Sequence, residues 1–179
     1  MVILREILKI FEAASPEGEQ RLPDGTWLVS PAPEIAPKAW HHIMFAPPLS
    51  RAEIEDMESS LHSRLPTGLE HLYSQCNGLS LFGRMVSIWG RRTTWERSVE
   101  KAWQPFDLVH HNQAAERPKA SPYSLVYFGS TDKGENWVFF DAADNSIGKT
   151  PRASFKREGS WPDFNTWFLE ELSRIRSHK

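Results

Sequence analysis

The sequence predicts an α+β fold in a single domain with an N-terminal proline-rich arm. Two observations carry the fold class: amphipathic helical patterns come early and last along the chain, and short apolar runs separated by turn residues lie between them. A third is size, because a chain of 179 residues buries roughly 70% of its unfolded surface on folding and needs no disulfide or metal to hold its core.

The N-terminal segment predicts a docking helix followed by an arm. Apolar residues Ile3, Ile7 and Phe11 recur at helical spacing, with charged residues opposite them. Prolines then recur through residues 15–49, where they remove backbone donors and favour extended or irregular chain. One short strand is expected at residues 26–29. We expect residues 1–44 to form this helix and arm, packed on a domain that comprises residues 45–179.

Two helices are expected after the arm. Ser50 and Glu53 have the spacing of a capping box, in which each side chain accepts a hydrogen bond from the other residue's backbone. Pro66 ends this helix, and Thr67 can cap a second one that carries Cys76. The pair Asn77-Gly78 is expected to terminate the second helix, because glycine tolerates the left-handed conformation that follows a helix.

Short strands are expected next, at residues 79–83 and 85–89, which are apolar runs bounded by glycine. Residues 91–124 are polar and mixed. Within them we expect a helix around Trp95–Trp103, followed by a loop.

The last part of the chain predicts a meander and a helix. Strands are expected at residues 125–128, 137–141 and 147–150, joined by turn residues. Ser160 is expected to be the N-cap of the closing helix. The expected buried stripe of that helix comprises Phe164, Trp167, Phe168, Leu172 and Ile175.

Composition excludes several classes of protein. The net charge of −2 argues against a strongly basic nucleic-acid binder. The single cysteine, Cys76, excludes a disulfide framework and is consistent with a reducing compartment. No apolar stretch approaches the length of a membrane span, and the N-terminus lacks a signal-peptide pattern. We therefore expect a cytoplasmic location.

Motifs for catalysis are weak. Residues 143–150 fit a permissive P-loop spelling, but Pro151 follows at once and no helical pattern begins there. Cys76 has only His71 near it on the same expected helix, five residues earlier. The pairs His41-His42 and His110-His111 lack partners at metal-ligand spacing. We expect no catalytic residue, cofactor or metal, and keep a small hydrolase or nucleotide-binding enzyme as the least favoured alternative.

Charge is uneven along the chain. Residues 51–83 and 120–148 each carry a net charge of −3, whereas residues 84–119 and 149–179 each carry +3. The acidic segments are either a solvated surface or a patch that steers a basic partner. Tryptophan is favoured at interface hot spots, so two tryptophans join the acids in a predicted contact surface. It comprises Glu55, Asp56, Trp95, Trp103, Asp132, Glu135, Asp141 and Asp144.

The order of motifs resembles the SUKH superfamily, which includes fungal cell-wall-synthesis regulators and many bacterial proteins. The resemblance covers residues 45–172. Its most specific part runs from Pro48-Leu49-Ser50 through Leu65-Pro66 to Asn77-Gly78, and it continues through residues 136–141 to the closing helix.

The resemblance implies helices packed against a twisted antiparallel β-sheet. It also implies a non-enzymatic immunity protein that neutralises a cognate polymorphic or contact-dependent toxin by direct binding, and such toxins are often nucleases with basic surfaces. The expected partner is thus a protein toxin, without direct nucleic-acid or membrane binding, and the protein is expected to be a monomer or weak homodimer. A regulatory scaffold for endogenous proteins is the alternative.

Overall fold

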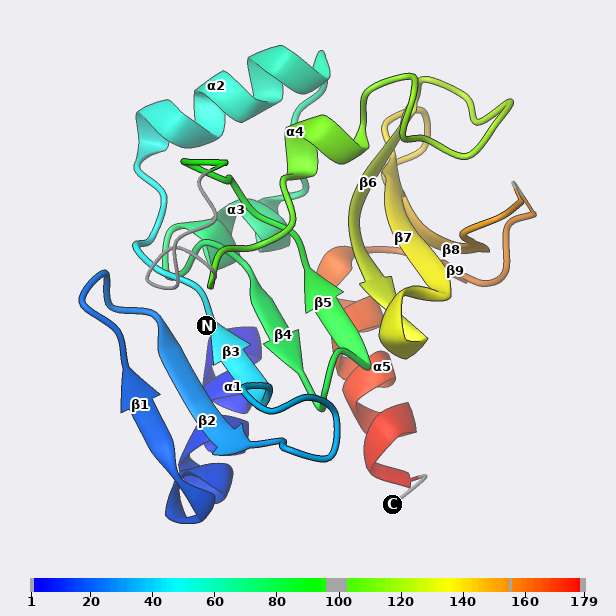
Figure 1. Cartoon of the computed structure of the whole chain (residues 1–179). Coiled ribbons are helices and arrows are strands. Elements are labelled where there is room, and N and C mark those ends of the chain that lie inside the picture. Colours follow the sequence, from blue (N-terminus) through cyan, green and yellow to red (C-terminus); the bar gives the residue numbers. More distant parts are fainter. Residues whose placement is uncertain (1, 96–102, 155, 178–179) are drawn as a thin grey trace.

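The computed structural model describes residues 2–95, 103–154 and 156–177. Within these residues, nine strands form one antiparallel sheet in which each strand pairs with the next along the chain (Figure 1). This confirms the predicted α+β fold. The strands are β1 (Glu19–Arg21), β2 (Trp27–Pro31), β3 (Trp40–Met44), β4 (Leu79–Leu81), β5 (Val86–Ile88), β6 (Leu125–Thr131), β7 (Asn136–Asp141), β8 (Ser146–Pro151) and β9 (Ser160–Trp161).

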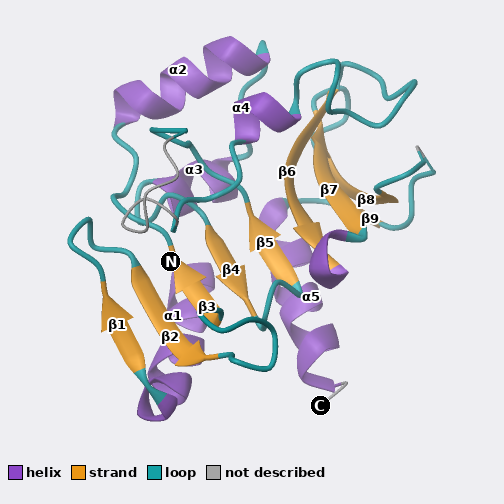
Figure 2. Ribbon diagram, in the orientation of Figure 1, coloured by secondary structure: helices purple, strands orange, loops and turns teal. Residues whose placement is uncertain are grey.

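Helices cover one face of this sheet and one end of it. We call the helix-covered side the back face; there α1 and α5 lie behind the strands in the view of Figure 2. α2 and α3 lie at one end, and the short α4 lies beside β6. The helices are α1 (Val2–Ala14), α2 (Arg51–Leu61), α3 (Thr67–Tyr73), α4 (Leu108–His111) and α5 (Phe164–Ser177), with 3-10 turns η1 (Ser15–Glu17) and η3 (Asp132–Gly134).

The main core fills the space between the back face and these helices. The stripe predicted for the last helix is confirmed, since Phe164, Trp167, Phe168, Leu172 and Ile175 are all buried. The docking helix is confirmed as α1, whose Ile3, Ile7 and Phe11 are buried in the same cluster.

Strand register decides which side chains reach the opposite, front face. Residues directly opposite each other in an antiparallel pair share a face, and the pairs link Leu28, Ile43, Ser80, Ser87, Ser130 and Trp137 across six strands. Apolar residues of β2 and β3 thus lie at one side of the front face and aromatic residues of β6 and β7 at the other.

The N-terminal segment contains more strand than predicted. The expected strand at residues 26–29 corresponds to β2, but β1 and β3 flank it and pair with it on both edges. Proline still has its expected effect, because residues 32–39 between β2 and β3 contain no strand. The sheet is continuous from this segment into β4, through the pairing of Ile43 with Ser80.

Helix ends were predicted with mixed success. The capping box at Ser50 and Glu53 is confirmed. The second helix instead begins after Pro66 without a side-chain cap and ends at Tyr73, so Cys76 and Asn77 lie beyond it.

The predicted cap of the last helix was wrong. Ser160 pairs with Gly148 in the sheet, and Asp163 accepts a hydrogen bond of 2.8 Å from the backbone of Thr166 at the start of α5. The helix expected around Trp95–Trp103 lies mostly outside the described residues.

Candidate functional site

A connected group of aromatic rings lies on the front face around α4, β6 and β7. His111 is central, with ring centroids 4.5 Å from Trp89, 5.6 Å from Phe106 and 5.8 Å from Trp137. The group continues through Trp137 to Tyr127 and Phe139 and, in the other direction, through His110 to Trp95. Rings from four separate segments of the chain therefore form one continuous layer.

Arginine side chains lie over the rings of this layer. A guanidinium group over an aromatic face is attracted by the ring quadrupole, by about 0.5–1 kcal/mol at exposed sites. The distance from guanidinium carbon to ring centroid is 5.2 Å for Arg84 and Phe106, 4.6 Å for Arg92 and Trp95, and 5.8 Å for Arg152 and Trp137. Arg117 lies 5.2 Å from the ring of Tyr123 and 5.6 Å from that of Tyr127. Arg157 lies 5.4 Å from the ring of Phe139. We call these rings and arginines the arginine–aromatic face.

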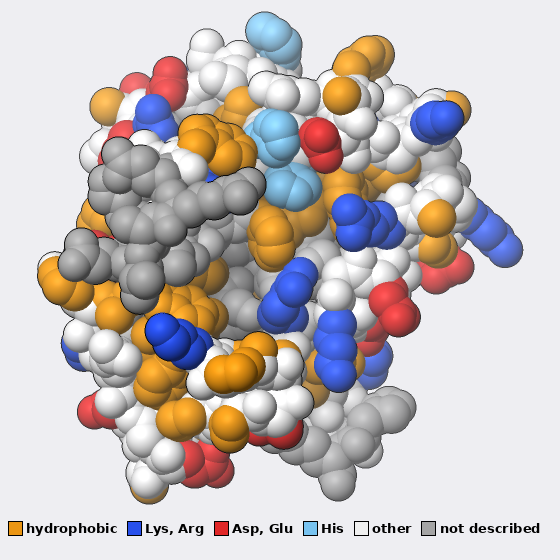
Figure 3. Space-filling model, viewed as in Figure 1, with side chains coloured by type: hydrophobic (Ala, Val, Ile, Leu, Met, Phe, Trp, Pro, Cys, Tyr) orange, Lys and Arg blue, Asp and Glu red, His pale blue; other side chains and the backbone are white. Residues whose placement is uncertain are grey.

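The layer combines a buried base with exposed rings. Trp89, Trp137 and Phe139 are buried, whereas Trp95, Phe106 and Tyr123 are 61%, 45% and 81% exposed. These three are among the few large apolar side chains that are exposed in the described part of the chain. Figure 3 shows Lys, Arg and His side chains among hydrophobic ones over the middle of this side of the molecule.

Local hydrogen bonds fix α4 beneath the layer. The carboxylate of Asp107 caps the helix by accepting from the backbone of His110 at 2.7 Å. The Nδ1 atom of His111 lies 2.8 Å from the carbonyl oxygen of Asp107. Burial lowers the pKa of His111, so the neutral ring is favoured where it packs between tryptophans.

Close packing also fixes Phe139 within the layer. Gly148 of β8 lies opposite Phe139, and a β-carbon at Gly148 would lie 2.3 Å from the ring. The glycine of the P-loop-like stretch at residues 143–150 therefore makes room for an aromatic ring. Most of that stretch lies in β8, not at the start of a helix.

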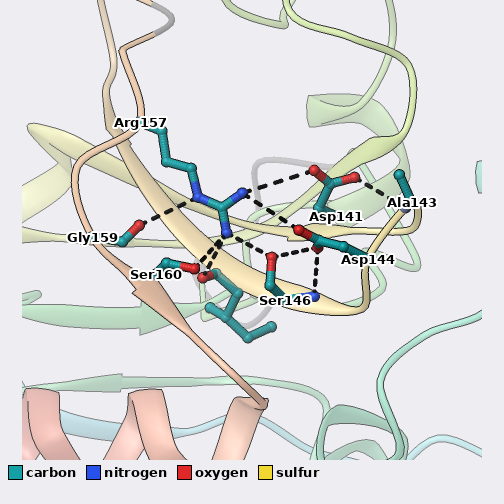
Figure 4. Close-up of polar contacts among 8 residues, drawn as sticks. Asp141, Ala143, Asp144, Ser146, Arg157, Gly159 and Ser160 are labelled. Atoms are coloured by element: carbon teal, nitrogen blue, oxygen red, sulfur yellow. Dashed lines mark hydrogen bonds and ion pairs between the residues drawn. The ribbon is translucent and has the colours of Figure 1, made fainter.

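The arginines differ in their ion pairs. In residues 2–95, 103–154 and 156–177, no carboxylate lies within 4.0 Å of the guanidinium nitrogens of Arg84, Arg92, Arg117 or Arg152. Arg157 is the exception, since its Nη1 lies 3.9 Å from Asp141 and 4.0 Å from Asp144 (Figure 4). The face therefore carries positive charge that its neighbouring acids do not neutralise.

Two of the predicted contact acids, Asp141 and Asp144, thus form ion pairs with Arg157. Figure 4 shows its guanidinium between Asp141 and Asp144 on one side and the 159–160 segment on the other, with a hydrogen bond of 2.9 Å to Ser160. Only 17% of the Asp141 side chain is exposed, against 57% for Asp144. Hydrogen bonds from Ser146 lower the pKa of Asp144.

Asp132 and Glu135 lie around the turn between β6 and β7. Asp132 forms an ion pair of 2.7 Å with Arg174 of α5. Burial alone would raise the pKa of Asp132, but hydrogen bonds from Arg174 and Asn136 outweigh it and lower the pKa. Glu135 is exposed.

The remaining predicted contact residues are spread over the molecule. Glu55 and Asp56 lie on α2, where they pair with Arg51 at 2.8 Å and Arg91 at 2.9 Å. Trp95 belongs to the arginine–aromatic face. Trp103 instead packs, with Trp40, against the apolar cluster of Leu28, Ile43 and Phe45. The acids therefore do not form one patch, and most of them pair with arginine.

Two of the residues considered for catalysis, Cys76 and His42, are buried and packed within the fold. Cys76 is buried, and burial raises its pKa to about 12. His42 packs against Phe82 and Phe11 on the back side of the sheet. Within the described ranges, no group of His, Cys, Asp and Glu side chains is arranged to hold a metal ion. Over those same ranges, no helix has the length and apolar character needed to cross a bilayer.

Sequence reasoning missed the arginine–aromatic face. Its signal was present in the +3 charge of residues 84–119 and 149–179. These two segments supply all five of its arginines, and the first also contains Trp89, Trp95 and Phe106. The register that brings Tyr127, Trp137 and Phe139 to the same face is a property of the sheet. No pattern in the separate segments indicates that they meet.

Comparison with protein families gives a match over most of the chain. The model of the SMI1 / KNR4 family (SUKH-1) matches residues 48–170, a range that begins just before α2 and ends within α5. The matched range therefore contains every residue of the arginine–aromatic face. No curated protein matches the chain.

Proposed function

The chain belongs to the SMI1 / KNR4 family (SUKH-1), and from this membership we propose that it is a non-enzymatic protein-binding module of the cytoplasm that neutralises a cognate toxin by direct binding. The family match, over more than half of the chain, is the observation that carries the proposal. A protein with the proposed role would act through the surface that it presents to its partner.

The composition of the arginine–aromatic face supports a binding role. Tryptophan, tyrosine and arginine are the residues most enriched at binding hot spots. Here exposed Trp95 and Tyr123 lie beside arginines that hold no carboxylate among the described residues. Such side chains contribute most to the free energy of binding when a partner buries them.

The structural roles of the motif residues support a non-enzymatic protein. Glu58 accepts a hydrogen bond of 2.9 Å from the backbone of Leu65 and pairs with Arg64, which fixes the bend before Pro66. Asn77 exchanges two hydrogen bonds of 2.7 Å with the backbone of Arg91. These side chains hold loops together and have no free group for chemistry.

A regulatory scaffold that binds endogenous proteins is the second candidate. The SUKH superfamily, which the sequence resembles, also includes fungal cell-wall-synthesis regulators, and this part of the resemblance supports the alternative. The same surface would serve either role, so the identity of the partner decides between them.

Co-expression with a toxin tests the proposal. The toxin domain encoded beside this protein's gene is expressed in a sensitive bacterial host with and without this chain, and growth is followed. Restored growth, with a stoichiometric complex in size-exclusion chromatography and light scattering, is expected. An unrelated toxin domain is the control and should stay toxic. Continued toxicity of the neighbouring domain, with no complex, would reject the immunity role.

A further inference from the structure

We infer that the arginine–aromatic face is the docking surface for an acidic segment of the protein partner. This rests on the proposed function only in taking the partner to be a protein. It reverses the sign of charge expected from the acidic segments of the sequence, where a basic partner was predicted.

The first argument is the free hydrogen-bonding capacity of two arginines of the face, Arg84 and Arg152. Arg84 and Arg152 are exposed and lie over Phe106 and Trp137. The N–H groups of a guanidinium lie in its own plane, where they can bind a carboxylate in a bidentate manner. Neither arginine has a carboxylate within 4.0 Å among the described residues. A carboxylate of the partner would satisfy these donors.

The second argument is preorganisation. Binding costs less when side chains are already held in place, and here the buried rings of the layer are fixed by their neighbours. Trp137 contacts Trp89 at 5.0 Å and Tyr127 at 5.4 Å. The rings thereby hold the arginines above them, so a partner meets a surface that needs little ordering.

The third argument is the exposed apolar area beside the charges. Phe106 is 45% exposed and Tyr123 is 81% exposed. Burial of aromatic area adds affinity that charge alone does not supply, since charge mainly sets the association rate and the specificity. The segment that fits this face therefore carries apolar or aromatic residues between its acids.

A protein partner fits this face better than a nucleic acid. Single strands are held by bases that stack on open aromatic faces. Here Trp89, Tyr127, Trp137 and Phe139 are 5% exposed or less, and each of the exposed rings, those of Trp95, Phe106 and Tyr123, already has a guanidinium over it. Phosphate backbones also select proteins with a strong positive charge, whereas this chain has a net charge of −2. The positive charge is local, as suits a short acidic segment.

Peptide selection tests the charge preference of the face directly. The full chain is immobilised and a random dodecapeptide library is panned against it. Peptides enriched in Asp and Glu, with apolar residues among them, are expected. A library enriched in Lys and Arg, or one without charge bias, would overturn the inference.

Variants then place the binding on the face. The affinity of the best peptide is measured by fluorescence anisotropy for the wild type and for Arg84→Glu with Arg152→Glu. We expect the double variant to weaken binding by about tenfold or more, and Arg84→Lys with Arg152→Lys to retain part of it because charge is kept. Arg5→Glu makes the same kind of charge change at an exposed arginine of α1, on the back of the sheet, and should leave the affinity unchanged. Circular dichroism confirms that each variant is folded.

Unchanged affinity in the folded double variant would overturn the inference. So would tighter binding of an oligothymidylate of equal length that the same variant abolishes, because the face would then hold nucleic acid. The result is separable from the proposed function. A toxin domain that binds wild type and double variant equally well would reject this face but keep the immunity role, whereas acidic peptides that bind here while no toxin does would reject the immunity role alone.

Discussion

The side-chain amide of Asn112 binds both backbone polar groups of Tyr127. The N–H of Tyr127 donates to Oδ1 of Asn112 at 2.8 Å, and Nδ2 of Asn112 donates to the carbonyl oxygen of Tyr127 at 2.7 Å. Strand β5 ends at Ile88, so Asn112 takes the place of a neighbouring strand at this point of β6. One side chain thereby attaches the end of α4 to the sheet and satisfies two backbone groups of a fully buried residue.

Replacement of Asn112 should loosen this attachment. Asn112→Ala leaves the N–H and C=O groups of Tyr127 without these partners, which costs about 1–3 kcal/mol for a buried group. Asn112→Asp keeps the acceptor but loses the donor, and it sets a carboxylate against the carbonyl of Tyr127, so it should also destabilise. Urea unfolding measures both. The control, Asn165→Ala at an exposed position of α5, should stay within about 0.5 kcal/mol of wild type. Equal stability of wild type and Asn112→Ala would contradict the assigned role.

Glu58 should matter more for stability than Glu55, one turn earlier on α2. The Glu58 side chain is 5% exposed, and it accepts from the backbone of Leu65 and from Arg64. Glu58→Ala leaves the buried N–H of Leu65 unsatisfied, at a cost of about 1–3 kcal/mol. Glu58→Gln keeps an acceptor and should lose less.

Glu55→Ala is the matched control on the same helix. It removes an exposed ion pair with Arg51, and such pairs contribute about 0–1 kcal/mol. Thermal and urea unfolding compare the three variants. A loss at Glu55 as large as that at Glu58 would show that helix content, and not the bend at Leu65, explains the result.

Local signals predicted most of the fold. The capping box of α2, the apolar stripe of α5 and the hairpins of β6–β8 each depend on residues close in sequence, and each was found. Strands β1 and β3 were missed because their pairing partner is β2 and their own sequences carry little β pattern. The cap at Ser160 failed because β8 competes for that residue through a non-local pairing.

The candidate site was harder to predict, for a related reason. Acidic residues stand out in a sequence, but their neutralisation by Arg157 and Arg174 depends on contacts across the fold. The same holds for Arg84 and Phe106, which belong to separate segments of the chain and meet only through the fold. Counting charges along the sequence identified the basic segments. That their arginines lie over the aromatic rings could be seen only from the folded structure.

Stability should fall as the pH drops below about 6.5 because of His111. Burial lowers the pKa of His111 below its ordinary value of 6.5, so the unfolded chain takes up a proton before the folded one does. Stability is then fully present above this value and is lost as the pH falls from it towards the folded pKa. The groups facing His111 are His110, Asp107 and Glu116.

Unfolding free energies measured between about pH 7.5 and pH 5.5 check this sign. His111→Gln should flatten the profile in that range. His71→Gln, at an exposed position on α3, should keep the wild-type profile. A wild-type protein that gains stability on acidification through this range would refute the assignment.

Asp144→Asn should speed association with the proposed protein partner. Asp144 is 57% exposed and lies 4.0 Å from Arg157. Replacement of its carboxylate by a neutral amide therefore makes the electrostatic potential of the arginine–aromatic face more positive. For an acidic partner segment we expect the association rate to rise about two- to threefold at low ionic strength and the gain to vanish at high salt. Glu12→Gln on α1 makes the same change of charge at an exposed site behind the sheet and should have little effect. Stopped-flow fluorescence measures both, and a slower rate for Asp144→Asn would indicate the basic partner expected from the sequence.

Gly78 should tolerate alanine far less well than Gly134, although their backbone angles are almost the same. Their φ values are +94° and +95°, a conformation that side chains disfavour. A β-carbon at Gly78 would lie 2.6 Å from the carbonyl oxygen of Ile88, whereas at Gly134 the nearest atom is 3.8 Å away on the flexible side chain of Arg84. Gly134→Ala therefore measures the backbone strain alone, about 1 kcal/mol or somewhat more. Gly78→Ala adds a clash with a strand that cannot move without disturbing β4 and β6, so it should cost well over 1 kcal/mol beyond the control. Urea unfolding of the two variants gives the difference, and equal losses would mean that Gly78 serves only its turn and not the packing of the 77–78 segment against β5.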